Sequence, residues 1–297
     1  MANPLVSICI PSYNRADLIE ETIASALAQT YTNIEVIVND NCSTDSSWQL
    51  LQELAAKDAR LRIFQNESNL GAVRNWQSVM KHAQGQYALI LWSDDLVKET
   101  FVEATLAAFT DDVAFVMTGV QEFDGTGVYY SSDYRMSGLV SVNAYLQEVL
   151  FKNKNRLPVS PSCALFRTAD LKKNIHAQLP NSDGIDFNKT GAGPDLLTFL
   201  LAAKDYPDIY IIPEHLALFR SHASSITVMA SQQSGLKLHY DWAKFFFVRG
   251  YLPEMLPKFK AITKIRYILH KRIHANMLRD MRTTRTDYFF MLRLFFQ

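Results

Sequence analysis

The chain has 297 residues, of which 48% are hydrophobic and 20% are charged. This is an ordinary globular composition, which excludes collagen-like, low-complexity or largely disordered chains. The 30 Lys and Arg residues balance the 30 Asp and Glu residues, but residues 244–297 hold 12 basic against 3 acidic side chains. An acidic body with a basic tail argues against general nucleic-acid binding and indicates that one end meets an anionic surface.

Cysteine spacing and hydropathy indicate the compartment. The three cysteines form neither a zinc-binding pattern nor a disulfide framework, which is typical of a reducing cytosol. The first residues have no basic segment leading into a long apolar stretch, so we expect no signal peptide. No apolar run approaches the roughly 18 residues of a membrane-spanning helix. We therefore expect a cytoplasmic protein, either free or attached peripherally to the cytoplasmic face of a membrane.

Short apolar runs alternate with helical patterns through the first part of the chain. Strands are predicted at residues 5–10, 34–38, 61–65, 87–92 and 113–118. Helices are predicted at residues 16–29, 48–54, 72–82 and 98–109. This alternation predicts a parallel sheet covered by helices on both faces. Because ligands of such sheets gather beyond the carboxyl ends of the strands, the chemistry is expected where the first four strands end.

The pattern loosens after about residue 119. A polar, tyrosine-rich loop is predicted at residues 125–138. Further helices are predicted at residues 142–151 and 195–203, and further strands at residues 162–166, 209–212 and 216–219. The chain from residue 232 onward is predicted to be helical, with interruptions at Pro253 and Pro257.

The first two strand ends carry groups suited to a nucleobase. The segment PSYNR (residues 11–15) joins a proline of fixed φ to an aromatic ring and an amide, a rigid platform for a planar base. The alternative is a plain helix start with Tyr13 in the core. The second strand is followed by the polar run 39–45, in which Asp40 can accept the ring N–H of a pyrimidine. The alternative is that this run only starts the next helix.

The third and fourth strand ends carry groups suited to a diphosphate and a metal ion. Gly71 permits close backbone approach at a helix start, and Arg74 adds a positive charge nearby. The alternative is an ordinary turn with a solvated arginine. Asp94 and Asp95 directly follow a buried strand, where a divalent ion with oxygen ligands, Mg²⁺ or Mn²⁺, would compensate them. The alternative is an aspartate pair that caps the next helix.

Together and in order, these strand ends resemble family 2 glycosyltransferases of the GT-A fold. The matching stretches are VSICIPSYNR (6–15), IEVIVNDNCSTD (34–45), NESNLGAVRN (66–75) and GQYALILWSDD (85–95). The resemblance covers about the first 110 residues and continues more loosely to about residue 227. It implies a GT-A-type, Rossmann-like mixed α/β sheet flanked by helices, with a helical C-terminal extension.

The resemblance also implies an activity. It is that of an inverting enzyme that moves a hexosyl or related sugar from a nucleotide-sugar, commonly UDP-linked, to an acceptor hydroxyl. The product would be a surface polysaccharide or glycolipid, and the acceptor a glycan or a lipid-linked sugar. The division implied is a donor-binding half (1–118), an acceptor-binding half (119–230) and a basic helical extension (231–297).

The resemblance assigns roles by position. The residues implied to bind the donor are Pro11, Tyr13, Asn14, Asp40, Asn69, Gly71, Arg74, Ser93 and Asp94. The residues implied to bind a divalent cation, Mn²⁺ or Mg²⁺, are Asp94, Asp95 and His222. For His222 the alternative is an ordinary structural histidine. Two positions depart from the family: Trp92 replaces the first aspartate of its Asp-x-Asp motif, and Asn41 replaces the second acid after strand two.

Inversion in a single displacement needs a carboxylate that takes the acceptor proton. The family places an acid at a helix start after a glycine-containing loop, and the matching residue is Asp195, with Pro194 in place of a preceding acid. The helix N-terminus is expected to hold Asp195 ionised. Asp183 and Asp186 are reserve candidates, and an ordinary first-turn aspartate is the alternative.

The basic tail and the departures leave two further alternatives. Basic and apolar residues interleave at Lys258, Lys260, Lys264, Arg266, Lys271, Arg272 and Arg279. Such helices suit either an anionic membrane surface or packing against the body with a solvated basic face. The departures also keep open a catalytically degenerate sugar-nucleotide-binding subunit of a glycan assembly complex. A dehydrogenase and a P-loop enzyme are disfavoured because their glycine-rich motifs are absent.

Overall fold

A single mixed sheet organises the protein. The computed structural model describes residues 3–152, 154–222, 225, 236–269 and 275–281. Within them, ten strands follow the order β3-β2-β1-β4-β9-β6-β10-β5, with β7 beside β6 and β8 beside β10. The strands are β1 (Val6–Ser12), β2 (Ile34–Asp40), β3 (Leu61–Gln65), β4 (Tyr87–Ile90), β5 (Leu96–Val97), β6 (Val113–Asp124), β7 (Gly127–Ser131), β8 (Gly138–Ser141), β9 (Ala164–Arg167) and β10 (Asp208–Arg220).

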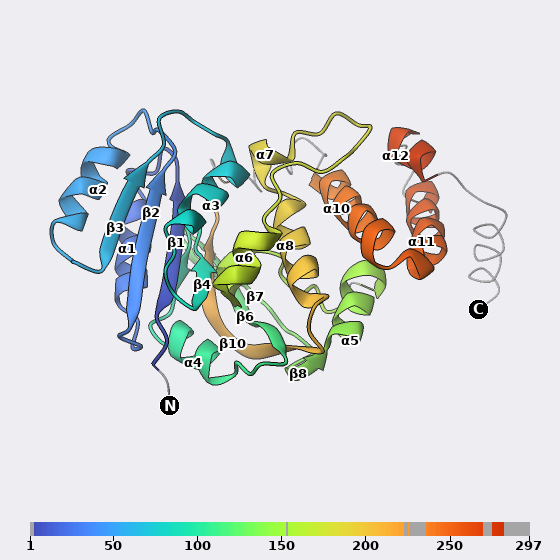
Figure 1. Cartoon of the computed structure of the whole chain (residues 1–297), viewed down its shortest axis with the longest axis horizontal. Coiled ribbons are helices and arrows are strands. Elements are labelled where there is room, and N and C mark those ends of the chain that lie inside the picture. The colour runs from blue at the N-terminus through green and yellow to red at the C-terminus, as the bar shows by residue number, and fades with distance from the viewer. Residues whose placement is uncertain (1–2, 153, 223–224, 226–235, 270–274, 282–297) are drawn as a thin grey trace.

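Helices cover the sheet, and further helices lie beyond it at one end of the molecule (Figure 1). Those before residue 150 are α1 (Ile19–Leu27), α2 (Ser47–Ala55), α3 (Ala72–Lys81), α4 (Phe101–Ala107) and α5 (Val142–Gln147), the last continued by the π-helix η1 (Glu148–Lys152). Those after it are η2 (Pro161–Cys163), α6 (Thr168–Asn174), α7 (Phe187–Thr190), α8 (Pro194–Ala203), α10 (Leu236–Tyr251), η3 (Pro253–Met255), α11 (Leu256–Leu269) and α12 (Ala275–Asp280).

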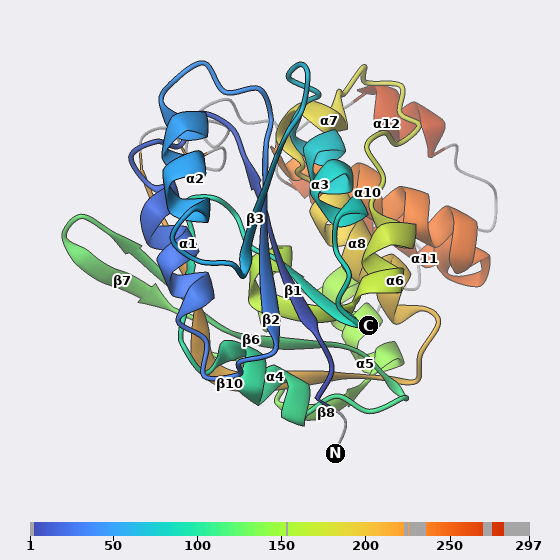
Figure 2. The same cartoon turned by 60° about the vertical axis from the view of Figure 1, so that its left-hand side comes forward.

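The first half of the sheet is parallel, as the sequence predicts. Strand β1 pairs in parallel with β2 and β4, so that Cys9 lies opposite Ile37 on one side and Ile90 on the other. Every residue of β1 and β2 is buried. Helices α1 and α2 lie on one face and α3, α6 and α8 on the other (Figure 2). The carboxyl ends of these strands therefore meet at one edge of a fully covered sheet.

The second half mixes directions. Strand β9 runs antiparallel between β4 and β6, and β10 runs parallel to β6. The two strands predicted at 209–212 and 216–219 are one strand, β10. Its pairing with β6 continues across a bulge, which lies between Ile212, paired with Thr118, and His215, paired with Gly119. A proline is tolerated within such a bulge, where its missing N–H removes no ladder hydrogen bond. This long strand returns to the edge at which β1 and β4 end.

The prediction of a loop at residues 125–138 is wrong in part. Strand β7 pairs antiparallel with the end of β6, which runs six residues beyond its predicted end. The resulting hairpin projects from the body (Figure 2), and Val128 and Tyr129 on it are each 54% exposed. Polar composition hides this strand from sequence reasoning because neither of its faces enters the core.

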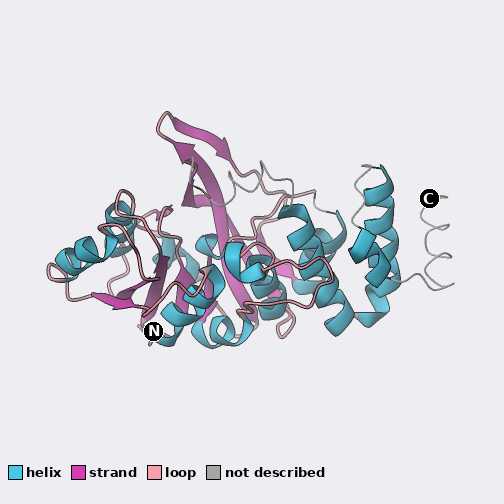
Figure 3. Cartoon of the chain, turned by 90° about the horizontal axis from the view of Figure 1, so that it is seen from above, coloured by secondary structure: helices cyan, strands magenta, loops and turns pink. Residues whose placement is uncertain are grey.

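Helices α10, α11 and α12 form a group at one end of the molecule (Figures 1 and 3). The predicted interruption at Pro253 is confirmed, since η3 separates α10 from α11 there. The one predicted at Pro257 is wrong, because Pro257 is the second residue of α11, a position with no intrahelical N–H partner to lose.

Part of the basic tail packs against the body. The Lys258 ammonium lies 4.6 Å from the ring centroid of Phe151, and Arg266 donates to the Phe151 carbonyl. Arg279 is exposed, whereas Lys271 and Arg272 lie outside the described residues. Among the described residues, no helix has both the length and the apolarity to cross a bilayer.

Candidate active site

A cavity of about 890 Å³ opens where β1, β4 and β10 end. Nine residues singled out from the sequence line it: Pro11, Tyr13, Asn14, Asn69, Gly71, Ser93, Asp94, Asp95 and Asp195. The buried Ser12 hydroxyl also lines it and has no hydrogen-bond partner among the described residues.

The turn after β1 presents an aromatic ring to this cavity. Asn14 adopts φ 51°, and its side chain accepts from the Thr44 N–H at 2.8 Å while its own N–H donates to Ser43 Oγ at 2.8 Å. Tyr13 is 39% exposed on the cavity wall, which excludes the alternative that it packs in the core. The turn is thus held from the β2 side, with the tyrosine ring free to face a planar group.

Asp40 does not reach the cavity wall. Its buried carboxylate accepts from the Ser43 N–H at 2.9 Å, from the Ser43 hydroxyl and from Gln65 Nε2 at 3.0 Å. The neighbouring Asn41 lines the cavity instead, and its amide donates to Asn69 Oδ1 at 2.9 Å. The structure therefore gives Asp40 a role in holding the turn that carries Asn41.

The start of α3 is closed by a side chain from α7. Asn188 accepts from the Arg74 N–H at 2.9 Å and donates to the Leu70 carbonyl at 2.7 Å. Gly71, at φ 85°, lines the cavity, whereas the exposed Arg74 side chain lines a separate hollow with Lys81 and Lys172. The structure does not bring Arg74 to the large cavity, because Ala72, Asn75 and Trp76 form the face of α3 that lines it and Arg74 lies on another face.

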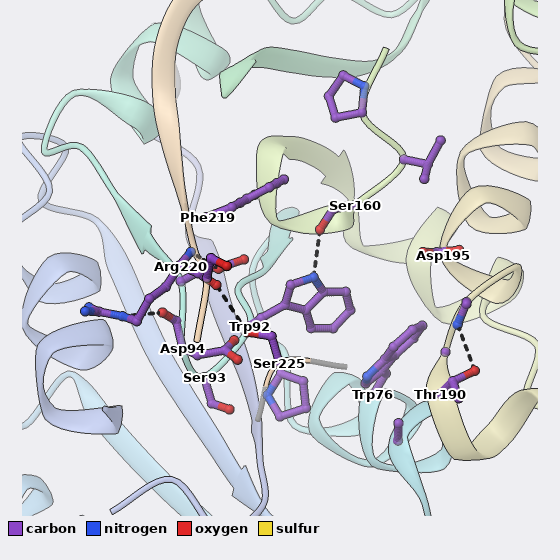
Figure 4. A pocket seen from close by; sticks show the side chains of 18 of the residues that line it. Trp76, Trp92, Ser93, Asp94, Ser160, Thr190, Asp195, Phe219, Arg220 and Ser225 are labelled. Atoms are coloured by element: carbon purple, nitrogen blue, oxygen red, sulfur yellow. Dashed lines mark hydrogen bonds between the residues drawn. The ribbon is translucent and has the colours of Figure 1, made fainter. Parts of the chain in front are cut away.

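The aspartate pair after β4 meets basic side chains from two other segments, and Figure 4 shows Arg220 beside Asp94. Asp94 Oδ2 lies 3.0 Å from His222 Nε2 and 3.6 Å from Arg15 Nη2. Asp95 is 5% exposed and accepts from the Arg220 N–H at 3.0 Å, while Arg220 Nε donates to the Asp94 carbonyl at 3.0 Å. Burial, and then the adjacent Asp94, raises the pKa of Asp95. Asp95 thus ties the end of β10 to the cavity, and Asp94 is the more accessible carboxylate.

These groups fit a divalent cation as a partial ligand set. No three His, Cys, Asp or Glu side chains cluster for a metal among the described residues. Asp94, which lines the cavity, and His222 nevertheless supply one carboxylate and one imidazole in contact with each other. A cation that shares its ligands with a diphosphate, as Mg²⁺ and Mn²⁺ do, needs only one or two protein groups. Asp95 is already engaged with Arg220.

Asp195 lies across the cavity at the start of α8. Its Oδ1 accepts from the N–H groups of Gly193 at 2.8 Å and Leu196 at 2.6 Å, and its Oδ2 accepts from the Tyr240 hydroxyl at 2.9 Å. Burial of the carboxyl raises its pKa to about 7 against these lowering bonds. The expectation that the helix N-terminus keeps Asp195 fully ionised is therefore wrong, because desolvation outweighs the helix dipole.

The two reserve aspartates have structural partners away from the cavity. Asp183 accepts from the indole N–H of Trp242 at 2.8 Å. Asp186 precedes α7 and accepts from the Asn188 N–H at 3.1 Å and from Gln178 Nε2 at 2.9 Å. Neither lines the cavity, whereas Asp195 does, as does Glu122 on β6.

The structure adds residues that the sequence reasoning did not assign to the site. Arg15 belongs to the PSYNR segment, so its position after β1 was an available signal. Tyr240 lies on α10, 45 residues after its partner Asp195, and no local pattern marks it. Trp76 also lines the cavity, with its ring centroid 4.6 Å from that of Trp92.

Gly191 fixes the approach of Trp76 to the loop before Asp195. It adopts φ 73°, and a Cβ added to it would lie 2.3 Å from the Trp76 ring. We expect Gly191→Ala to lower the free energy of unfolding by about 1–3 kcal/mol more than Gly184→Ala. Gly184 is the matched control because it has φ 68° and open space around it, so it shares only the backbone strain. Urea unfolding of both variants measures the difference, and equal losses would contradict the close packing.

Solved structures share this fold. S. aureus TarS 1–349 in complex with UDP-GlcNAc matches with a TM-score of 0.60 and 22% identity, over 75% of this chain and 60% of that one. The mannosyltransferase PcManGT from Pyrobaculum calidifontis, in complex with GDP-Man and Mn²⁺, matches with a TM-score of 0.54 and 15% identity, over 98% and 88%. At these identities the likeness concerns the fold, which is that of the GT-A glycosyltransferases.

The sequence defines the family more closely. The Glycosyl transferase family 2 profile matches residues 7–175, more than half of the chain. The chain therefore belongs to family 2 and is a glycosyltransferase, as the resemblance predicts. It is 29% identical to glycosyltransferase GlyG of Streptococcus pneumoniae, over 75% of this chain and 72% of that protein.

Two further relatives match over shorter stretches. The putative teichuronic acid biosynthesis glycosyltransferase TuaG of Bacillus subtilis is 38% identical, over 41% of this chain and 50% of that protein. The UDP-Glc:alpha-D-GlcNAc-diphosphoundecaprenol beta-1,3-glucosyltransferase WfaP of Escherichia coli is 34% identical, over 46% and 51%. The chain thus spans about half the length of these two relatives.

Proposed function

We propose that the chain transfers a sugar from a UDP-linked donor to an acceptor hydroxyl, with inversion at the anomeric carbon and with the help of Mn²⁺ or Mg²⁺. One observation carries this proposal. Asp94, in contact with His222 and Arg15, and Asp195, whose pKa lies near 7, line the same cavity. A site that must stabilise a leaving diphosphate and accept a proton needs these two kinds of carboxylate.

The donor nucleotide would lie along the ends of β1 and β2. Tyr13 offers an exposed ring, with Asn14 and Asn69 beside it on the cavity wall. WfaP is named as an enzyme that uses UDP-Glc, and TarS is described in complex with UDP-GlcNAc, which favours UDP over other carriers. Because PcManGT is described with GDP-Man, an experiment must also test GDP-linked sugars as donors.

Asp94 and His222 would hold the divalent cation, together with diphosphate oxygens of the donor. When bound, the cation supplies positive charge that stabilises the leaving diphosphate. Arg15 adds a second positive charge at 3.6 Å from Asp94. Arg220 anchors the Asp94 backbone and the Asp95 side chain, which keeps this part of the site fixed. PcManGT, which shares the fold, is described with Mn²⁺.

Asp195 would act as the base for the acceptor hydroxyl. Its carboxylate accepts the hydroxyl proton while the acceptor oxygen forms a bond to the anomeric carbon and the bond to the diphosphate oxygen breaks. Two backbone N–H groups and the Tyr240 hydroxyl orient it. A pKa near 7 lets the same carboxyl be ionised yet basic at neutral pH. Attack from the side opposite the leaving group gives inversion.

The proposed function also assigns a role to each part of the chain and a class of acceptor. We propose that residues 1–118 hold mainly the donor, that residues 119–230 face the acceptor, and that residues 231–297 form a basic extension. WfaP is named for a diphosphoundecaprenol-linked acceptor, which supports a lipid-linked acceptor here. An anionic membrane surface for the extension is supported by its charge and by the exposed Arg279 alone.

Release of nucleoside diphosphate tests the proposed function. The protein is incubated with UDP-, GDP- and dTDP-linked sugars, each with Mn²⁺, with Mg²⁺ or with EDTA, with methyl glycopyranosides as acceptor probes. We expect release from a UDP-sugar that depends on the added cation, and a product of inverted anomeric configuration by NMR. Release that persists unchanged in EDTA contradicts the metal assignment, and a retained configuration contradicts the single displacement.

A further inference from the structure

An indole occupies the place of an acidic residue at the centre of the cavity. Trp92 follows β4 two residues before Asp94, where family 2 enzymes resembling this chain have the first aspartate of their motif. Its indole N–H donates to Ser160 Oγ at 2.7 Å, and its backbone N–H donates to Ser162 Oγ at 2.9 Å. The indole and the backbone of Trp92 are therefore each anchored by a serine hydroxyl. The benzene edge and faces of the ring are left for packing or for a ligand.

A second indole, that of Trp76, is only 6% exposed and packs against Trp92. The rings of Trp76 and Trp92 lie 4.6 Å apart between centroids with an interplanar angle of 37°. Trp76 packs so closely on Gly191 that a Cβ there would lie 2.3 Å from its ring. The Gly191 carbonyl in turn accepts from the Asp195 N–H at 3.1 Å. The tryptophan pair is thus fixed in position relative to the Asp195 carboxylate through one short loop.

The pair lies between the two carboxylates of the site. Figure 4 shows Trp92 between Asp94 on one side and Trp76, Thr190 and Asp195 on the other. All of these residues line the same cavity. A group that rests on Trp92 would therefore lie in the same cavity as both carboxylates.

We propose that Trp92, backed by the buried Trp76, forms the floor of an acceptor-sugar subsite. The inference rests on the proposed function, and it assigns the acceptor as a pyranose ring that stacks on an indole. The axial C–H groups of a pyranose make one face apolar, which suits an aromatic ring, while its edge hydroxyls remain available. Because the floor is tied to Asp195 through Gly191, stacking would bring one edge hydroxyl to the base.

Kinetics separates this role from a structural one. We expect Trp92→Ala to raise the KM for a methyl glycopyranoside acceptor by about tenfold, the loss expected for one buried aromatic contact. Acceptor-independent hydrolysis of the UDP-sugar should stay within about twofold of wild type, since the donor groups are untouched. Trp92→Phe should recover most of the acceptor KM. Trp48→Ala is the control, because Trp48 is partly buried on α2 and lies outside the cavity.

Indole NMR gives a readout without turnover. The four tryptophan side chains are labelled with ¹⁵N and assigned through single Trp→Phe variants, in the presence of UDP and Mg²⁺. We expect methyl glycopyranosides to shift the Trp76 and Trp92 signals saturably, and Trp48 and Trp242 to stay unchanged. Sorbitol, a polyol without a ring, should shift none of them.

The possible failures are distinguishable. A wild-type protein that releases no nucleotide from any donor contradicts the proposed function itself. Normal donor turnover together with an unchanged acceptor KM in Trp92→Ala contradicts only the subsite. Indole shifts that sorbitol reproduces, or that appear with the donor sugar and not with the glycopyranosides, likewise overturn it.

Discussion

Asp195→Asn is expected to reduce sugar transfer by about 10²- to 10⁴-fold, the usual contribution of a general base. The expected cause is specific, because the amide cannot take the acceptor proton, while Tyr13 and Asp94 of the donor site remain in place. Transfer is measured with a UDP-sugar and a glycopyranoside acceptor, and nucleotide affinity by titration calorimetry. UDP binding should be unchanged. A variant that retains transfer within about tenfold would contradict the assignment of the base.

The pH dependence of the rate follows from the same carboxyl. Since Asp195 has a pKa of about 7 and acts ionised, the wild-type rate should rise through pH 7 and level off above it. The Tyr240 hydroxyl bond lowers this pKa, so Tyr240→Phe should move the rise to higher pH. A downward movement in Tyr240→Phe would contradict the role of Tyr240, and a wild-type rate independent of pH between about 6 and about 8 would contradict that of Asp195.

The Asp195 contribution to the free energy of unfolding should fall with rising pH, whereas the activity should rise. Because folding raises the Asp195 pKa, the neutral form stabilises the folded state, and this contribution is lost as pH rises from about 4 through about 7. The asparagine in Asp195→Asn does not titrate, so the variant does not lose this contribution. Its amide oxygen can still accept the hydrogen bonds from the Gly193 and Leu196 N–H groups. Its free energy of unfolding relative to wild type should therefore increase up to about pH 7 and stay constant above.

Asp94→Ala is expected to abolish the metal-dependent part of nucleotide binding. In wild type, UDP with Mn²⁺ at 100 times its Kd should add about 2.7 kcal/mol to the free energy of unfolding. For a protein of this size, this corresponds to a rise in Tm of roughly 5 °C. The variant should lose this rise because it removes the carboxylate that contacts His222 and Arg15.

The design of this measurement includes a matched aspartate. Asp111→Ala removes an exposed carboxylate in the turn before β6, outside the cavity, and should leave the rise intact. EDTA should lower the wild-type rise to that of the Asp94→Ala variant. An equal rise in the variant and in wild type would show that the nucleotide binds without Asp94 and would contradict the proposed metal position.

Much of the donor side of the site was predictable from short segments. Tyr13, Ser93 and Asp94 line the cavity because each directly follows a strand whose apolar run is visible in the sequence. Parallel strands bring their carboxyl ends to one edge, so the strand pattern also predicts that these residues lie together. The family match at residues 7–175 covers the same part of the chain.

Side-chain direction and burial were not predictable in the same way. Asp40 was predicted in the turn after the second strand but is the last residue of β2, and Ser43 and Gln65 engage its carboxylate. Arg74 follows Gly71 as predicted, yet its side chain lines another hollow. In both cases the backbone position is local information, whereas the direction of the side chain depends on neighbours that pack around it.

The sequence by itself determined the strand and helix order, the family and the edge of the sheet where the candidate chemistry lies, because these depend on apolar periodicity and turn residues within short segments. Only the tertiary structure decided the pKa of Asp195, the contact of Tyr240 with it and the pairing of Trp76 with Trp92. These features join parts of the chain that are distant in sequence. Their energies come from desolvation and packing, which exist only once the chain has folded.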